Sequence, residues 1–348
     1  MTEQCQMDLL TPIVARAEWH ANFAALIDHP NQWNSAVLSD WAVGFKDRDG
    51  KFVREFQTTF NGCFWELYLN AVLCERQLTI DFTFPSPDFA VTAPWTFAME
   101  ATIASNSPDT LPEHRRADAQ LPDNLNEFNR QAIIRLSNSL LSKYRKFKSN
   151  YEALPHVAGK PFVIALAPFH APNFPLTCQR AIEALLFNYY IDEEDYIAGR
   201  QTDRPIPRGF LSSVQKDNQA PIELGVFQNG SMPEVSAVLW NSCATWGKIR
   251  ALSQDPNPDI FFTALRLDSQ SSYPHKVKNR KRDYKETLLD GLRIYHNPQA
   301  LHPLDPAIFR SPEVFQAYYC LQTGAWVYEQ QDGQLLFRIV ETHETKQR

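Results

Sequence analysis

The sequence predicts an α/β protein in which helices flank a mixed sheet, with a helical N-terminal arm and a β-rich C-terminal extension. Three observations predict this class. Residues 57–169 pass through helix, three strands, helix and strand, the order of an α/β unit. Residues 8–45 carry a broad apolar stripe with helical spacing, whereas residues 222–340 consist mainly of short strand-like runs. The 348 residues are 44% hydrophobic and 21% charged, as expected of a globular protein with a large core.

The N-terminal arm is expected to be helical from residue 8 to about residue 45, with an interruption at His29-Pro30-Asn31. Residues 45–52 contain Asp49-Gly50 and are typical of a polar turn. Apolar residues then recur at steps of three and four, which predicts a helix over 57–77. These residues are Phe60, Phe64, Leu67, Tyr68, Ala71 and Val72.

Short strands are expected to follow this helix, because hydrophobicity alternates in residues 79–84 and continues through 88–91 and 95–103. Residues 105–123 are rich in Ser, Pro and Asp and predict a loop. A long helix is expected over about 124–151. The run GKPFVIALAPF, residues 159–169, predicts a buried strand that completes the core.

The remaining chain predicts a helix over 175–190, a loop over 191–209 and strand-like runs within 222–270. Residues 326–340 alternate around Asp332-Gly333, which indicates a hairpin. We therefore divide the chain into three parts. They are a helical arm (1–55), a core (56–200) and a β-rich region packed on that core (201–348).

Three carboxylates stand in apolar surroundings within the core. Glu66 borders the apolar side of the first core helix, Asp88 precedes one strand, and Glu100 ends the apolar run of the next strand. A lone buried carboxylate is costly, so such acids require a partner, a metal or access to solvent. Mg²⁺ binds through one or two carboxylates together with waters. A metal held in this way can orient an attacking water and neutralise charge on a phosphodiester.

The segment from about Phe60 to Phe169 resembles the core of the PD-(D/E)XK nuclease superfamily. Pro87-Asp88 matches the first half of the motif, and Glu100-Ala101-Thr102 matches the second half with Thr in place of Lys. The resemblance implies a restriction-endonuclease-like fold and metal-dependent hydrolysis of phosphodiester bonds, of DNA in preference to RNA. It also implies that Glu66 is the helix acid of the site. The metal, Mg²⁺ or Mn²⁺, is expected on Asp88, Glu100 and the carbonyl of Ala101.

The motif lysine is absent at Thr102, and members of the superfamily are known in which this lysine has moved to the following helix. In this sequence that helix contains Lys143, which lies on the edge of the apolar stripe formed with Leu136, Leu140 and Phe147. A lysine at such an edge can extend its ammonium over the sheet. Lys143 is therefore the expected replacement for the motif lysine.

Each of these residues also has a structural interpretation. Asp88 after Pro could start a turn, Glu66 and Glu100 could be satisfied by a lysine or arginine, and Lys143 could simply extend its side chain to solvent. Two functions therefore stay open. One is a nuclease that uses Glu66, Asp88, Glu100 and Lys143. The other is a catalytically inactive protein of the nuclease fold that binds nucleic acid or a protein partner.

Nucleic-acid binding would have to come from a local patch, because the net charge is −6 and the pI is near 5.9. Residues 276–285 carry six Lys or Arg and one Asp. This run is either a solvated loop or an arm that follows the phosphate backbone. In the second interpretation the contacts come from Lys278, Arg280, Lys281 and Arg282.

Other classes find little support in the sequence. The cysteines have no metal-ligand spacing, the histidines are expected to be structural or surface residues, and there is no GxGxxG, P-loop or GxSxG motif. The sequence has no secretion signal and no apolar run of roughly 20 residues, so a cytoplasmic protein without membrane attachment is expected. A homodimer or larger complex remains open.

Overall fold

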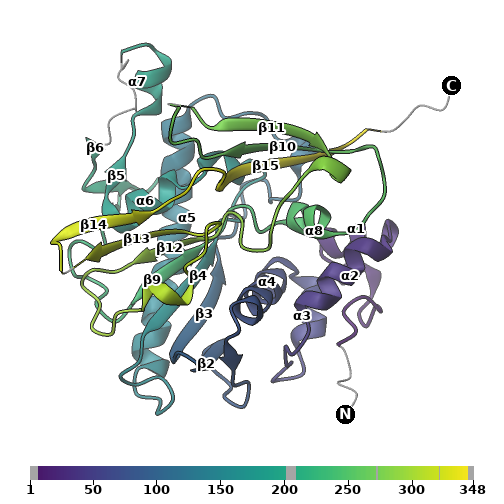
Figure 1. Ribbon diagram of the computed structural model, residues 1–348, viewed down its shortest axis with the longest axis horizontal. Helices are drawn as coiled ribbons and strands as arrows, with labels where there is room; N and C mark the ends of the chain where they lie inside the picture. The colour runs from purple at the N-terminus through teal and green to yellow at the C-terminus, as the bar shows by residue number, and fades with distance from the viewer. Residues whose placement is uncertain (1–6, 201–208, 272, 321, 344–348) are drawn as a thin grey trace.

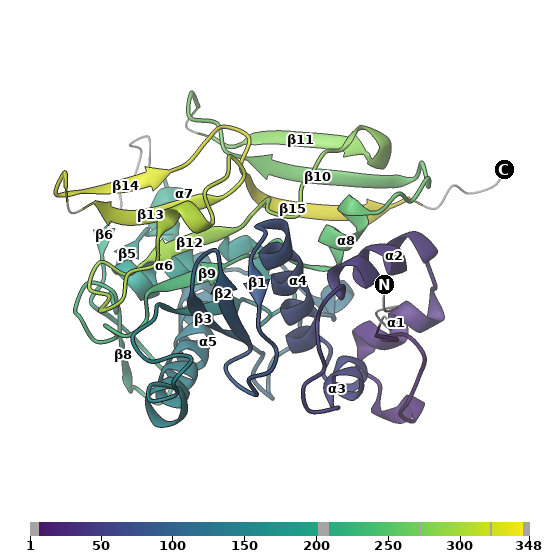
Figure 2. The same cartoon turned by 60° about the horizontal axis from the view of Figure 1, so that its bottom comes forward.

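The computed structural model describes residues 7–200, 209–271, 273–320 and 322–343. Its centre is an eight-stranded mixed sheet with the strand order β1-β2-β3-β4-β9-β12-β13-β14 (Figure 1). A three-stranded sheet with the order β11-β10-β15 lies across the top of this large sheet in Figure 2. The prediction of a mixed α/β protein is confirmed.

The helices gather on the two faces of the large sheet, with α1 to α4 on one side and α5 and α6 on the other (Figure 1). The α-helices are α1 (Ala21–Asp28), α2 (Gln32–Trp41), α3 (Phe52–Thr58), α4 (Asn61–Glu75), α5 (Leu125–Lys146), α6 (Arg180–Phe187), α7 (Glu193–Ile197) and α8 (Trp246–Leu252). The shorter turns are η1 (Arg16–Glu18), η2 (Arg116–Asp118), η3 (Phe147–Tyr151), η4 (Phe174–Thr177), η5 (Lys281–Asp283) and η6 (Pro306–Ile308).

The strands of the large sheet are β1 (Thr79–Ile80), β2 (Phe89–Ala93), β3 (Phe97–Ile103), β4 (Phe162–Ala167), β9 (Ala237–Trp240), β12 (Arg293–His296), β13 (Phe315–Cys320) and β14 (Ala325–Glu329). The three-stranded sheet contains β10 (Ile260–Arg266), β11 (His275–Arg280) and β15 (Leu335–Thr342). Two small pairs join β5 (Tyr189–Tyr190) to β6 (Gly209–Phe210) and β7 (Ser213–Gln215) to β8 (Pro221–Glu223).

The part of the chain that carries the three acids folds as α4-β1-β2-β3-α5-β4. Strands β1, β2 and β3 run antiparallel in succession, and β4 pairs in parallel with β3. The expectation that residues 60–169 contribute to one mixed sheet with two helices packed on it is confirmed, and the structure places α4 on one face and α5 on the other. Asp88 directly precedes β2 and Glu100 lies within β3, so both belong to this sheet.

Strand alternation decides which face each residue of β3 presents. Phe97, Met99 and Ala101 pack in the core shared with α4, whereas Ala98 packs in the core shared with α5. Because side chains alternate along a strand, Glu100 shares the α5 face with Ala98. The long helix opposite it begins at a conventional cap, where Asn124 Oδ1 accepts a hydrogen bond from the Glu127 N–H at 2.7 Å.

Several boundaries in the first hundred residues differ from the prediction. Residues 8–15 are not helical, because Asp8 Oδ1 accepts the N–H groups of Leu10 and Thr11 in a local turn. The helix predicted over 57–77 is divided between α3 and α4 at Phe60, whose φ is +47°. The strand predicted over 79–84 ends after Ile80, and Asp81 closes the next turn by accepting the Thr83 N–H at 2.8 Å.

The C-terminal half differs in strand partners more than in strand positions. The hairpin predicted over 326–340 is wrong, because β14 pairs with β13 while β15 pairs with β10 in the other sheet. Alternating hydrophobicity locates two strands but does not show that they pair with each other. The loop predicted over 191–209 contains the short helix α7, capped by Asp192, and its residues 201–208 lie outside the described part of the chain.

The large sheet does not stop at the predicted boundary near residue 200. Strand β9 pairs in parallel with β4, and β12, β13 and β14 continue the sheet beyond it. The three-stranded sheet is tied to its surroundings by a buried ionic group, in which Glu286 lies 2.5 Å from Lys248 Nζ of α8 and accepts a hydrogen bond from Arg338 Nε of β15 at 2.9 Å. Breaking such a buried pair typically costs about 3–5 kcal/mol. The ionic group thus ties β15 of the three-stranded sheet to α8 and to the loop before β12.

Candidate active site

Glu100 is a carboxylate in the middle of a sheet, with none of its side chain exposed to solvent. Its Oε1 accepts hydrogen bonds from two ammonium groups of α5, Lys143 Nζ at 2.7 Å and Lys146 Nζ at 2.9 Å. Burial disfavours the ionised form of Glu100, but the two lysines outweigh this effect and hold its pKa below the usual range. Glu100 therefore stays ionised inside the protein.

The two lysines come from one flank of α5, because residues three apart are neighbours on a helix. Lys143 is the more enclosed, with 23% of its side chain exposed against 44% for Lys146. The structure therefore brings Lys143 to Glu100, as the sequence predicts. It adds Lys146, whose ammonium also lies 5.1 Å from the centre of the Tyr151 ring.

Asp88 is held where the β2–β3 ladder ends. The last cross-strand pair is Phe89 with Met99, so the N–H of Ala101 lies beyond the ladder. Asp88 Oδ2 accepts that N–H at 2.7 Å. On its other side, Asp88 Oδ1 lies 3.6 Å from Arg48 Nη2, and 21% of the Asp88 side chain is exposed. The hydrogen bond to Ala101 ties Asp88 to the residue next to Glu100.

Arg48 belongs to the N-terminal arm and reaches the acids through backbone contacts. Its Nη1 donates to the carbonyls of Phe84 at 3.1 Å and Pro87 at 2.8 Å. These two bonds fix the guanidinium beside the chain that leads into β2. The sequence analysis missed Arg48, because it lies in a polar turn between α2 and α3 that carries no motif.

Glu66 is the third acid and lies on α4. Burial, and next the charge of Asp88, raise the pKa of Glu66 to about 8. Burial and the charge of Glu100 likewise raise the pKa of Asp88 to about 6. The three acids thus act on one another electrostatically, and not all of them are ionised at pH 7 without a further cation.

The two motif acids each have one carboxylate oxygen to which no described residue donates a hydrogen bond. Glu100 Oε2 is buried and has no hydrogen-bond partner among the described residues, while Oε1 carries both lysines. Asp88 Oδ1 lies opposite Arg48 at a distance longer than a hydrogen bond. Carboxylate oxygens that lack donors are the ligands that Mg²⁺ and Mn²⁺ prefer. Asp88 and Glu100 could hold the metal, whereas among the described residues Glu66 does not join them in a set of three ligand atoms within 4.8 Å of one another.

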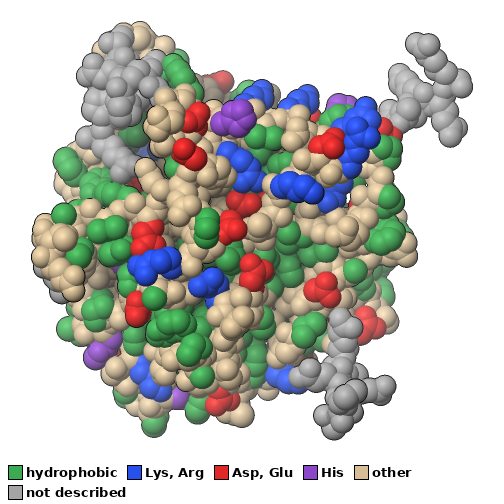
Figure 3. All heavy atoms as spheres, viewed as in Figure 1, with side chains coloured by type: hydrophobic (Ala, Val, Ile, Leu, Met, Phe, Trp, Pro, Cys, Tyr) green, Lys and Arg blue, Asp and Glu red, His purple; other side chains and the backbone are tan. Residues whose placement is uncertain are grey.

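The basic run lies in the other sheet. Lys278 and Arg280 alternate along the exposed side of β11, and Lys281 and Arg282 follow in η5. The prediction of a loop is therefore wrong for residues 276–280, which pair with β10, whereas the basic side chains there are exposed to solvent as expected. Lys and Arg side chains gather over this part of the surface in Figure 3. Lys281 is half-buried and donates to the Ala251 carbonyl at 2.9 Å.

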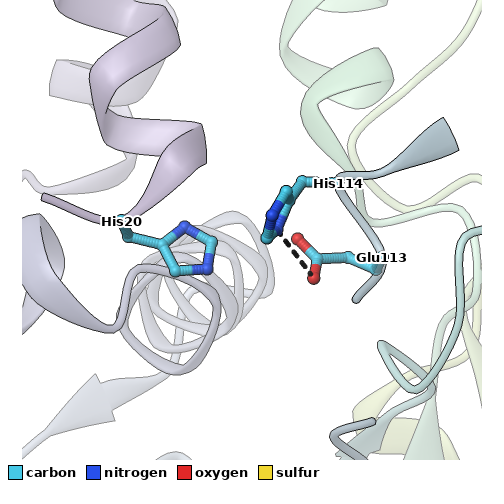
Figure 4. A group of neighbouring side chains, drawn as sticks. All are labelled: His20, Glu113 and His114. Carbon is cyan, nitrogen blue, oxygen red and sulfur yellow. Dashed lines mark ion pairs between the residues drawn. The ribbon is translucent and has the colours of Figure 1, made fainter. Parts of the chain in front are cut away.

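A second group of polar side chains was missed entirely. His20, Glu113 and His114 converge from the start of α1 and from the loop before α5 (Figure 4). Glu113 and His114 line a cavity of about 380 Å³ between the N-terminal arm and the core, whereas His20 is not one of its lining residues. Residues 20 and 113 are far apart in sequence, so no spacing rule could have found the group.

Comparison with known proteins leaves the family open. Neither the protein-family models, nor the curated proteins, nor the solved structures give a match to this chain. Within the described residues, no helix combines the length and the apolar character needed to cross a membrane. The resemblance to PD-(D/E)XK nucleases therefore rests on the motif residues of the sequence alone.

The raised pKa of Glu66 predicts an unusual pH dependence of stability for the metal-free protein. Above pH 6.5 the unfolded chain has already ionised this carboxyl, whereas the folded protein still holds its proton up to about pH 8. Unfolding therefore releases a proton, and the free energy of unfolding falls as pH rises from 6.5 to 8. At about 1.4 kcal/mol per pH unit, the fall is on the order of 1–2 kcal/mol.

Urea unfolding in a chelator, from pH 6.5 to 9, measures this dependence. Glu66→Gln carries no titrating group, so its stability should lack the fall that the wild type shows. Glu55→Gln, which changes an exposed glutamate of α3, should follow the wild type. Parallel curves for wild type and Glu66→Gln would show that Glu66 ionises alike in the folded and unfolded states.

Proposed function

We propose that the protein is a metal-dependent nuclease of the PD-(D/E)XK type that hydrolyses phosphodiester bonds, of DNA in preference to RNA. One observation carries the proposal. Lys143 and Lys146 place two ammonium groups on Glu100, within a cluster that also contains Asp88 and Glu66. A lysine beside the second motif acid is what the sequence lacks at Thr102, and α5 provides it in space.

The order of elements supports the same proposal. The superfamily core has a helix with an acid, a strand with Asp, a strand with (Asp/Glu)-X-Lys, and then a helix and a strand. The chain runs α4-β1-β2-β3-α5-β4, with Glu66 on α4, Asp88 before β2 and Glu100 in β3. The pairing of β1, β2 and β3 as antiparallel neighbours, with β4 parallel to β3, places Asp88 and Glu100 at adjacent strands of one sheet.

The residues of the chain have distinct tasks in this proposal. Asp88, Glu100 and the carbonyl of Ala101 would hold Mg²⁺ or Mn²⁺, which when bound supplies positive charge at the phosphate and a more acidic water. Lys143 faces the scissile phosphate and stabilises the charge that develops on its oxygens as the water oxygen attacks phosphorus. The bond from phosphorus to the leaving oxygen then breaks, and that oxygen takes up a proton. Glu66 lies within electrostatic reach of Asp88 and accepts a proton from water when ionised.

Nucleic-acid contacts are assigned to the exposed side of the three-stranded sheet. Lys278, Arg280 and Arg282 are exposed there, and such side chains can follow phosphates. Lys281 contributes less in this arrangement, because its ammonium already bonds to the Ala251 carbonyl. The chain carries a net charge of −6, so this strand supplies the local positive charge that DNA requires.

A catalytically inactive protein of the same fold, which binds nucleic acid or a protein partner, is the second candidate. The position of Arg48 favours it, because the guanidinium lies 3.6 Å from Asp88 and already balances part of the negative charge. In an inactive protein Arg48 and the two lysines would replace the metal permanently. The two candidates therefore differ in whether a divalent cation displaces Arg48 from Asp88.

A cleavage assay separates them. The wild-type protein, incubated with Mg²⁺ or Mn²⁺, should cut single- or double-stranded DNA, and a chelator should stop the reaction. Asp88→Asn should lower the cleavage rate at least about a hundredfold, since the protein then binds the metal, and with it the positive charge at the phosphate, more weakly. Glu55→Gln, which removes an exposed acid away from the cluster, should keep the wild-type rate. No cleavage of DNA or RNA with either metal would favour the inactive protein.

The basic strand is tested by the salt dependence of DNA binding. Replacing Lys278, Arg280, Lys281 and Arg282 with Ala should weaken binding and flatten the slope of log K against log salt, because each lost phosphate contact releases one counterion fewer. Four exposed cations elsewhere, Arg16, Lys51, Arg54 and Arg310, form the matched control when changed to Ala. Equal slopes of log K against log salt for the two quadruple variants would show that the basic strand does not contact DNA.

A further inference from the structure

His20, Glu113 and His114 form a second polar group, in the loop and helix start described above (Figure 4). One potential ligand atom from each residue lies within 4.8 Å of the other two. His114 Nδ1 is 3.7 Å from Glu113 Oε2, and the two imidazole rings lie edge-on with centres 5.3 Å apart. Two imidazoles and one carboxylate are a ligand set that binds zinc.

Hydrogen bonds from neighbouring residues orient these side chains, as such bonds do for the ligands of known metal sites. Asn22 Nδ2 donates to Glu113 Oε1 at 2.8 Å and to Asn61 Oδ1 at 3.0 Å, which fixes the carboxylate. Glu113 is 7% exposed, so its negative charge is buried beside the histidines. His114 Nδ1 is also buried and has no hydrogen-bond partner among the described residues.

His20 has a structural role that metal binding would have to displace. Its Nδ1 accepts the Asn22 N–H at 3.1 Å and so caps α1, which leaves Nε2 for a metal. Coordination through Nε2 places the proton on Nδ1 and breaks the cap. Losing a cap costs roughly a factor of ten in an equilibrium constant, whereas zinc sites gain many orders of magnitude. Zinc binding at Nε2 is therefore favoured over the helix cap at Nδ1.

The three ligand atoms are farther apart than zinc requires, so the side chains must move closer together when the metal binds. Tetrahedral zinc with bonds near 2.1 Å holds its ligand atoms about 3.4 Å apart, so the side chains must close by roughly 1 Å. Phe60, Phe64 and Trp246 line the adjoining cavity of about 380 Å³ together with Glu113 and His114. Two of the three protein ligands, Glu113 and His114, face this space, which leaves the fourth coordination position to a water or a small ligand from the cavity.

We propose that His20, Glu113 and His114 form a zinc site whose fourth position opens into this cavity. The site is separate from the acids at Asp88 and Glu100, and it takes a different class of metal, because imidazole favours zinc whereas carboxylates favour Mg²⁺ and Mn²⁺. Bound zinc would connect the start of α1 to the loop before α5, and so the N-terminal arm to the core.

Zinc affinity, measured on the full chain by competition with a chromophoric chelator, tests the proposal. The wild type should bind one Zn²⁺, and Asp88→Asn should bind it with the same affinity. That result would separate this site from the acid cluster. His20→Asn is the informative variant, because Asn is an excellent N-cap and keeps α1 capped while removing the imidazole. It should bind Zn²⁺ at least about a hundredfold more weakly. His114→Asn and Glu113→Gln should do the same, and Gln still accepts from Asn22.

Two further measurements complete the test. His29 lines the same cavity but is not a proposed ligand, so His29→Ala should keep the wild-type affinity for Zn²⁺. Excess Zn²⁺ should raise the thermal midpoint of the wild type and of His29→Ala but not that of His20→Asn, while the metal-free proteins melt alike. Equal Zn²⁺ affinity of wild type and His20→Asn, or loss of the affinity in Asp88→Asn, would overturn the proposal.

Discussion

The buried carboxylate of Glu100 is the constraint on which the candidate active site depends. A charge with no exposed surface is costly unless it is paired, and removal of one partner from a buried ion pair costs about 3–5 kcal/mol. Two lysines of α5 meet this requirement, which fixes how α5 lies across β3. The position of the helix and the charge of the site thus have one cause. A fold that needed only stability could have placed an apolar residue at this position.

The other acids extend the same constraint to the rest of the chain. Asp88 bonds to the N–H of Ala101 where the β2–β3 ladder ends, and Arg48 approaches it from the N-terminal arm. Glu66 completes the cluster from α4, and burial together with the charge of Asp88 raises its pKa to about 8. Three acids, two lysines and one arginine therefore come from four separate parts of the chain. The arm is part of the site, since Arg48 belongs to it.

The sequence predicts the local part of this arrangement and not the pairing over long distances. Periodicity located α5, and short apolar runs located the strands β2, β3 and β4, of which β4 is buried along its whole length. The same periodicity could not show that β14 and β15 join different sheets, because partner choice depends on the whole fold. Lys143 could be proposed from its place on the helix edge. Arg48 could not, because it acts on Asp88 through contacts that only the folded chain makes.

The central claim is that Lys143 replaces the lysine missing at position 102, and DNA cleavage by Lys143→Ala tests it most directly. Thr102 lies two residues after Glu100 on β3, so a lysine there emerges on the same face of the sheet. The cleavage rate of Lys143→Ala should be lower by roughly a hundred- to a thousandfold, whereas the protein should still fold and bind Mg²⁺. Thr102→Lys in the same protein should restore part of the rate. Wild-type cleavage by Lys143→Ala would contradict the claim.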